Sequence, residues 1–94
     1  MYYVYRLQSQ SCPSFAYTGY TTDLKRRLAE HSRGQVASTK KYAPFTLVFY
    51  SAFKAARAAR NFKGYLKSGS GKAFARKRLW PADEGPGSSP TYGL

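Results

Sequence analysis

The sequence has few acidic residues, a single cysteine and no long apolar run, and each shortage excludes a class of protein. Because Cys12 is the only cysteine, neither an intrachain disulfide nor a cysteine-rich zinc site can form, and a reducing compartment fits. No apolar stretch reaches the length of about 18 residues that a membrane-spanning helix needs, so we expect none. The chain starts directly with a strand-like run, so we also expect no signal peptide.

The shortage of acids leaves a strongly basic domain. Residues 1–80 contain all sixteen Lys and Arg of the chain but only two of its four acids, Asp23 and Glu30, and so carry a net charge of +14. This charge points to a polyanion, nucleic acid first and an anionic membrane surface second, because solubility alone requires no such one-sided balance. Basic side chains would contact phosphates without reading the base sequence. The candidates are Lys25, Arg26, Lys40, Lys41, Arg57, Arg60, Lys63, Lys67 and Lys72.

Hydrophobic periodicity and turn residues predict one domain over residues 1–80 with the order ββαβα(α). Strands are predicted over 2–8, 15–20 and 45–53, and helices over 22–33, 54–66 and 72–80. Thr22 is the expected N-cap of the first helix, Gly34 follows its end, and Ser68-Gly69-Ser70-Gly71 separates the last two helices. The side chains expected to pack inward from those two helices are Ala55, Ala58, Ala59, Phe62, Phe74 and Leu79. Residues 81–94 are rich in Pro, Gly and Ser, and we expect a disordered tail.

Two tyrosines, an arginine and a histidine are predicted to line one concave surface. A hairpin closing about Ser11 would set Tyr5 opposite Tyr17 on one face of the sheet. On the first helix, Arg27 and His31 are one turn apart, beside the apolar stripe expected to face the sheet. These are groups that phosphodiester chemistry would use. Two structural alternatives remain open: the tyrosines could fill a core, and His31 could merely interact with the helix dipole.

Four short motifs occur together in the order typical of one family. They are Tyr3-Val4-Tyr5, Tyr17-Thr18-Gly19, Asp23-Leu24-Lys25-Arg26-Arg27-Leu28-Ala29-Glu30-His31 and Tyr65-Leu66-Lys67-Ser68-Gly69-Ser70-Gly71-Lys72-Ala73-Phe74. With them the chain resembles the GIY-YIG nuclease superfamily, in particular its small standalone bacterial proteins, which are related to the N-terminal domain of the excision-repair incision subunit. The resemblance covers roughly residues 1–80. It implies an α/β (α+β) domain in which helices flank a three-stranded antiparallel sheet.

The resemblance also implies a chemistry, the metal-assisted hydrolysis of one DNA strand. In that scheme Tyr5 or Tyr17 interacts with the attacking water or the cleaved phosphate. The residue at Arg27 stabilises phosphate charge, and the residue at His31 helps to manage protons. A glutamate on a later helix holds a single divalent cation, Mg²⁺ or Mn²⁺. A free tyrosine has a pKa of about 10 and is therefore a weak base at neutral pH. We expect the nearby cations to favour its phenolate and so make it a better proton acceptor.

One group of that scheme is missing. Small relatives typically read Phe-Glu-Lys-Tyr-Leu-Lys-Ser-Gly in the second helix, whereas this chain reads Phe62-Lys63-Gly64-Tyr65-Leu66-Lys67-Ser68-Gly69. Lys63 therefore stands at the position of the metal-binding glutamate. An ammonium group offers a hard divalent cation no oxygen ligand, so the sequence predicts poor metal binding. Gly64, in the middle of a predicted helix, is a second departure.

Two functional classes follow, and in both the protein binds the DNA backbone by structure rather than by sequence. The first is a metal-dependent endonuclease that acts on structured or damaged DNA in repair or recombination and is impaired here by Lys63. The second is a nucleic-acid-binding module that does not cut. A basic protein that binds RNA is a more distant third class. We expect a cytoplasmic, nucleoid-associated protein with no membrane partner.

Overall fold

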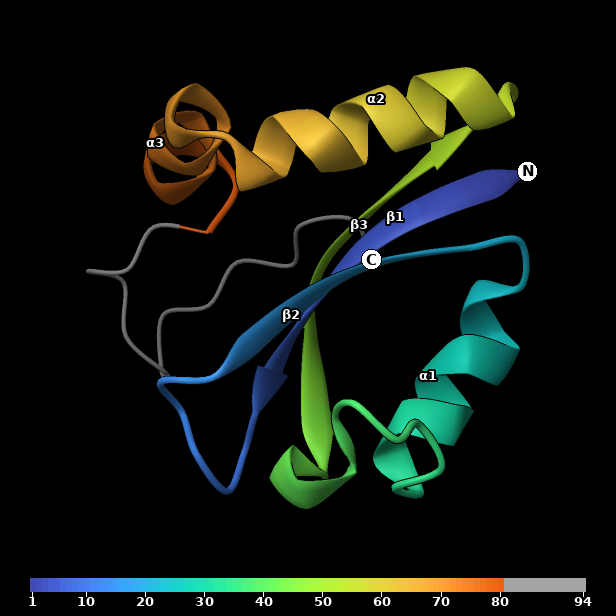
Figure 1. Cartoon of the computed structure of the whole chain (residues 1–94), viewed down its shortest axis with the longest axis vertical. Helices are drawn as coiled ribbons and strands as arrows, with labels where there is room; N and C mark the ends of the chain where they lie inside the picture. The colour runs from blue at the N-terminus through green and yellow to red at the C-terminus, as the bar shows by residue number, and fades with distance from the viewer. Residues whose placement is uncertain (81–94) are drawn as a thin grey trace.

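The computed structural model describes residues 1–80 and shows a three-stranded antiparallel sheet with helices on both faces (Figure 1). The strand order is β2-β1-β3, so β1 is central. The elements are β1 (Tyr2–Ser9), β2 (Ala16–Thr21), α1 (Leu24–Ser32), the 3₁₀ turn η1 (Lys40–Tyr42), β3 (Phe45–Phe53), α2 (Ala56–Lys67) and α3 (Gly69–Arg78). The predicted fold and element order are confirmed. The predicted tail over 81–94 lies outside the described residues.

Alternate residues of β1 enter two different cores, one on each face of the sheet. Val4 packs with Ala59 and Leu66 of α2 and with Ala75 of α3. The next residue, Tyr5, belongs to a second cluster that includes Leu7 and Phe45, with Leu24 and Leu28 of α1 packed against it. Because successive side chains of a strand point to opposite faces, α1 covers one face and α2 and α3 cover the other (Figure 1).

The hairpin between β1 and β2 differs from the predicted one by a shift of register. Tyr5 pairs with Gly19, and Leu7 pairs with Tyr17, so the prediction that Tyr5 lies opposite Tyr17 is wrong. The hairpin is centred one residue further along the chain than predicted, because it closes with the N–H of Ser9 donating to the carbonyl of Phe15. The two tyrosines stay on the same face, because the shift moves the partner by two residues and preserves side-chain parity.

The N-cap of helix α1 lies one residue later in the chain than predicted. Asp23, not Thr22, is the N-cap, and its carboxylate accepts a hydrogen bond from the N–H of Arg26 at 3.1 Å. A carboxylate at this position also interacts favourably with the positive end of the helix dipole. Gly34 follows the last turn with a φ of +72°, a left-handed conformation that glycine adopts without strain. The predicted role of Gly34 is confirmed.

The junction between α2 and α3 is tighter than the glycine-rich sequence suggested. Only Ser68 separates the two helices; its side chain caps α3 by accepting from the N–H of Gly71 at 3.1 Å. Gly69 and Gly71 lie within the first turn of α3 rather than in a longer break. Position 71 requires glycine because a Cβ there would overlap the carbonyl of Tyr65. Glycine therefore allows the two helices to meet at a sharp corner.

Three of the side chains predicted to pack inward from these helices are instead exposed. Ala55 and Ala58 face solvent, and the inward stripe of α2 runs through Ala59 and Leu66 with Phe62 beside it. On α3, Phe74 is 42% exposed, because the early start of that helix turns Ala75 to the core instead. The inward placement of Leu79 is confirmed.

Candidate active site

A chain of hydrogen bonds runs through the interior between β1 and α1. The hydroxyl of Tyr5 lies 2.8 Å from Nε2 of His31, and Nδ1 of His31 lies 2.9 Å from the hydroxyl oxygen of Thr39. The Thr39 hydroxyl donates to the carbonyl of Val36. Thr39 therefore accepts from Nδ1–H, and Nε2 accepts from the phenol of Tyr5, a tautomer assigned from this network. We call Tyr5, His31 and Thr39 the buried relay.

Gly19, the glycine of the motif Tyr17-Thr18-Gly19, leaves space for the ring of Tyr5. Tyr5 and Gly19 are direct partners across the β1–β2 ladder. A Cβ at position 19 would overlap the ring and hydroxyl of Tyr5. The absence of a side chain at Gly19 is thus what allows the Tyr5 ring to lie over β2 and reach His31.

Tyr17 and Arg27 stand between the buried relay and solvent. The ring of Tyr17 is 6.3 Å from that of Tyr5 and 5.2 Å from that of His31, measured between centroids. The side chain of Arg27 is 37% exposed and donates to a carboxylate oxygen of Glu30 at 3.0 Å. The same carboxylate accepts from Arg26 at 3.3 Å. One acid therefore orients two guanidinium groups on this side of α1.

Burial sets the charge state of the relay. It raises the pKa of Tyr5, and the opposing effect of the Arg27 guanidinium is smaller. Burial also lowers the pKa of His31, and the positive charge of Arg27 adds to that effect. Both groups are therefore neutral near neutral pH. The expectation that neighbouring cations would favour a phenolate is wrong for Tyr5, whose desolvation outweighs them.

The four predicted residues come together, but only two of them reach the surface. Tyr5 is 1% exposed and His31 is not exposed at all, whereas Tyr17 and Arg27 are half-buried. The prediction of one concave surface lined by all four is therefore corrected. Tyr17 and Arg27 can touch a bound group. Tyr5 and His31 lie behind them.

The described residues do not fit a divalent metal ion. No group of three His, Cys, Asp or Glu side chains gathers anywhere in residues 1–80. The acid nearest the relay, Glu30, is engaged by two arginines. Lys63 is half-buried on α2, where burial and the charge of Lys67 lower its pKa. A carboxylate set of the kind that holds Mg²⁺ is absent from this part of the chain.

The predicted phosphate contacts are spread over three helices and a turn. Among these nine cations only Lys63 is half-buried, and the other eight are exposed.

Two residues that bear on the site and its surroundings, Thr39 and Arg6, were not predicted from the sequence. Thr39 was missed because it lies in an irregular loop without a hydrophobic pattern. Arg6 was missed although its position gave a signal: it alternates with the core residues Tyr5 and Leu7 and therefore points to the other face of the sheet.

Comparison with known proteins agrees with this geometry. Residues 1–78 match the family model described as the GIY-YIG catalytic domain, a span that includes every element described above. Proteins named UPF0213 from Streptococcus pyogenes serotype M5 (strain Manfredo) and serotype M1 are each 44% identical to this chain over 52 residues. Those 52 residues are 54% of this chain and only 56% of each relative. No solved structure matches. None of the helices in residues 1–80 has the length and apolar character needed to span a bilayer.

Proposed function

The chain belongs to the GIY-YIG family, a nuclease family, and we propose that it binds DNA and holds a backbone phosphate against Tyr17 and Arg27 while cutting that strand slowly or not at all. The observation that carries the proposal is the buried relay directly behind these two surface residues. A half-buried tyrosine and arginine alone would be ordinary side chains at the surface. Fixed from behind by Tyr5 and His31, they form a pre-oriented binding site.

Each residue of the phosphate-binding site has a separate role. The guanidinium of Arg27 supplies paired N–H donors that match two phosphate oxygens, and Glu30 holds it in place. The hydroxyl of Tyr17 can donate to a further oxygen of the same phosphate. Tyr5 does not act as a base, because burial raises its pKa. It positions the site instead, through its hydrogen bond to His31.

Impaired cleavage follows from the missing carboxylate. Phosphoryl transfer places negative charge on the attacking and leaving oxygens, and a divalent ion is an effective stabiliser of both. Lys63 stands where the resemblance places the glutamate ligand, and the only acid near the relay is already paired. Arg27 remains to neutralise phosphate charge. One arginine supports binding better than it supports hydrolysis.

Substitution of Lys63 tests the proposal directly. Lys63→Glu should give Mg²⁺-dependent nicking of branched, flapped or nicked DNA that the parent chain lacks, since it restores an oxygen ligand. Lys63→Gln is the matched control: it removes the cation without supplying a carboxylate, and should not nick. If the parent itself cleaves strongly with Mg²⁺ or Mn²⁺, and Arg27→Ala abolishes that cleavage, then Lys63 is not disabling and the proposal is wrong.

A further inference from the structure

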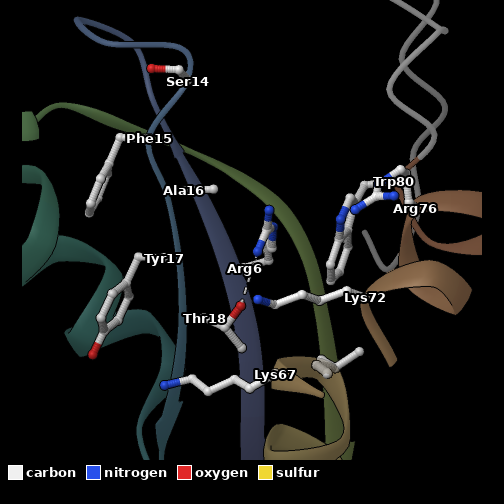
Figure 2. A pocket seen from close by; sticks show the side chains of 11 residues that line it. Arg6, Ser14, Phe15, Ala16, Tyr17, Thr18, Lys67, Lys72, Arg76 and Trp80 are labelled. Atoms are coloured by element: carbon white, nitrogen blue, oxygen red, sulfur yellow. Dashed lines mark hydrogen bonds between the residues drawn. The ribbon is translucent and has the colours of Figure 1, made fainter. Parts of the chain in front are cut away.

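A basic pocket opens between β1, β2 and α3, on the side of the sheet that α2 and α3 cover (Figure 2). Its volume is about 680 Å³. Four cations line it, Arg6, Lys67, Lys72 and Arg76, and no carboxylate of residues 1–80 does. They come from β1, α2 and α3, so the fold rather than one charged helix gathers them. A concave site lined by one sign of charge concentrates the field that attracts anions.

The environment of Arg6 favours the binding of an anion. Its side chain is half-buried, with the guanidinium carbon 4.5 Å from the centroid of the Trp80 ring. Its one side-chain hydrogen bond within the described residues goes to the hydroxyl of Thr18 at 3.3 Å. Both partners are neutral. The two ion pairs found in residues 1–80 both use Glu30, on the other face of the sheet.

A partly buried charge without a counter-ion is costly. Burial lowers the pKa of Arg6, and no ion pair within residues 1–80 offsets that effect. The other three cations are exposed, and Figure 2 shows Lys72 extending toward Arg6 across the pocket. A tetrahedral dianion or a backbone phosphodiester has the oxygens to engage a guanidinium fork and ammonium groups together.

We propose that the basic pocket binds a phosphate group of a nucleic-acid strand, with Arg6 at its base and Lys67, Lys72 and Arg76 around it. This phosphate is not the one held at Arg27. Tyr17 lines the pocket and also belongs to the candidate active site, so a strand that crosses the edge strand β2 would meet both places. The pocket would then fix one phosphate of the strand while a neighbouring phosphate lies at Tyr17.

Trp80 provides a readout that is independent of cleavage. It is the only tryptophan in the chain and it lines the basic pocket. We expect its fluorescence to change saturably when a short single-stranded oligonucleotide is added at constant ionic strength. Three versions of that oligonucleotide carry a 5′-phosphate, a 3′-phosphate or no terminal phosphate. Tighter binding of one phosphorylated version assigns the pocket to a strand end, and equal binding assigns it to an internal backbone phosphate. No saturable change with any version overturns the proposal.

Two double variants on α3 supply the matched comparison. Lys72→Gln/Arg76→Gln removes two cations of the pocket, whereas Lys77→Gln/Arg78→Gln removes two exposed cations of the same helix that do not line it. The first should weaken the Trp80 titration roughly tenfold or more, as expected for lost charge-assisted hydrogen bonds. The second should weaken it by about threefold or less. Equal losses would mean diffuse attraction and overturn the pocket. A failed nicking assay with Lys63→Glu leaves this titration unaffected, so the two proposals fail separately.

Discussion

His31 is fully buried, and both of its ring nitrogens are hydrogen-bonded. Protonating the imidazole would leave Nε2 with a proton facing the phenol of Tyr5, which already donates to it. The cation would also lie near the guanidinium of Arg27, while the compensating Glu30 is mostly occupied by its own arginines. The relay therefore depends on a neutral histidine.

This arrangement predicts a loss of stability in mild acid. Because the folded pKa of His31 lies below its ordinary value of 6.5, the unfolded chain binds the proton more readily. The stabilisation is complete above about pH 6.5 and is lost as the pH falls toward the lowered folded pKa. Urea unfolding from pH 7.5 to 5 should show a falling free energy of unfolding, with a slope of at most about 1.4 kcal/mol per pH unit for one proton.

The matched variant for this effect is His31→Gln, which keeps hydrogen-bonding capacity but does not titrate. It should be less stable at pH 7.5 and should show a flatter profile between pH 7.5 and 5. The two arginines lower the pKa of the Glu30 carboxylate, so its titration affects the free energy of unfolding in a separate pH range, below about pH 4.5. A parent profile as flat as that of His31→Gln would show that the imidazole does not titrate against folding.

At this scale the sequence predicted which residues meet but not how deeply they lie. Strand parity and helix spacing were sufficient to bring Tyr5, Tyr17, Arg27 and His31 together. Burial depends on the chain between α1 and β3, where Val36 and Thr39 are buried and Thr39 is hydrogen-bonded to His31. An irregular loop has no periodicity from which such contacts can be inferred. The partner of Nδ1 could therefore not have been predicted.

At the scale of elements, two of the three glycines in α2 and α3 are in opposite situations. Gly64 is exposed in the middle of α2, and a Cβ there would meet no atom within 4 Å. Gly71 is buried in the first turn of α3, where a Cβ would overlap the backbone of Tyr65. The first glycine only weakens its helix, whereas the second permits the α2–α3 corner.

Alanine at the two positions should therefore have opposite effects. Gly64→Ala should stabilise the protein by roughly 0.5–1 kcal/mol, because it removes the entropic cost of glycine in a helix. Gly71→Ala should destabilise it by about 1–3 kcal/mol or more, as expected for overpacking against backbone. Thermal unfolding measures both, since 1 kcal/mol corresponds to roughly 4–8 °C in a domain of this size. Destabilisation by Gly64→Ala would contradict the open position of that residue.

Helix and strand types were predicted from the sequence with small errors at the ends. The range predicted for β3 is the observed one, because β-branched and aromatic residues make up most of the stretch from Phe45 to Phe53. The start of α3 was predicted three residues too late. Glycine and serine usually mark a break, but here close helix packing at Gly71 requires the small residue within the helix. Tertiary contact therefore outweighed local propensity.

At the scale of the whole molecule, positive charge lies on both faces of the sheet. Arg26 and Arg27 stand on α1, and the basic pocket lies on the other face, beside α2 and α3. The net charge of +14 over residues 1–80 is balanced locally only at Glu30 and Asp23. A single strand that crosses β2 would be neutralised from two directions. A protein that used one face alone would contact fewer phosphates.

The two-sided arrangement predicts the salt dependence of binding. If the basic pocket and Arg27 each neutralise one phosphate, the slope of log Kobs against log salt should be about −1.4 on single strands and about −1.8 on duplex, because each phosphate contributes roughly −0.7 and −0.9 respectively. Anisotropy titrations between low and physiological salt measure both slopes. Lys72→Gln/Arg76→Gln should flatten the single-strand slope by about 0.7, the share of the one phosphate in the basic pocket. Arg27→Ala should flatten it by about the same amount, because Arg27 holds the second phosphate. A parent slope flatter than about −1 would place no more than one phosphate on the protein and contradict binding across both faces.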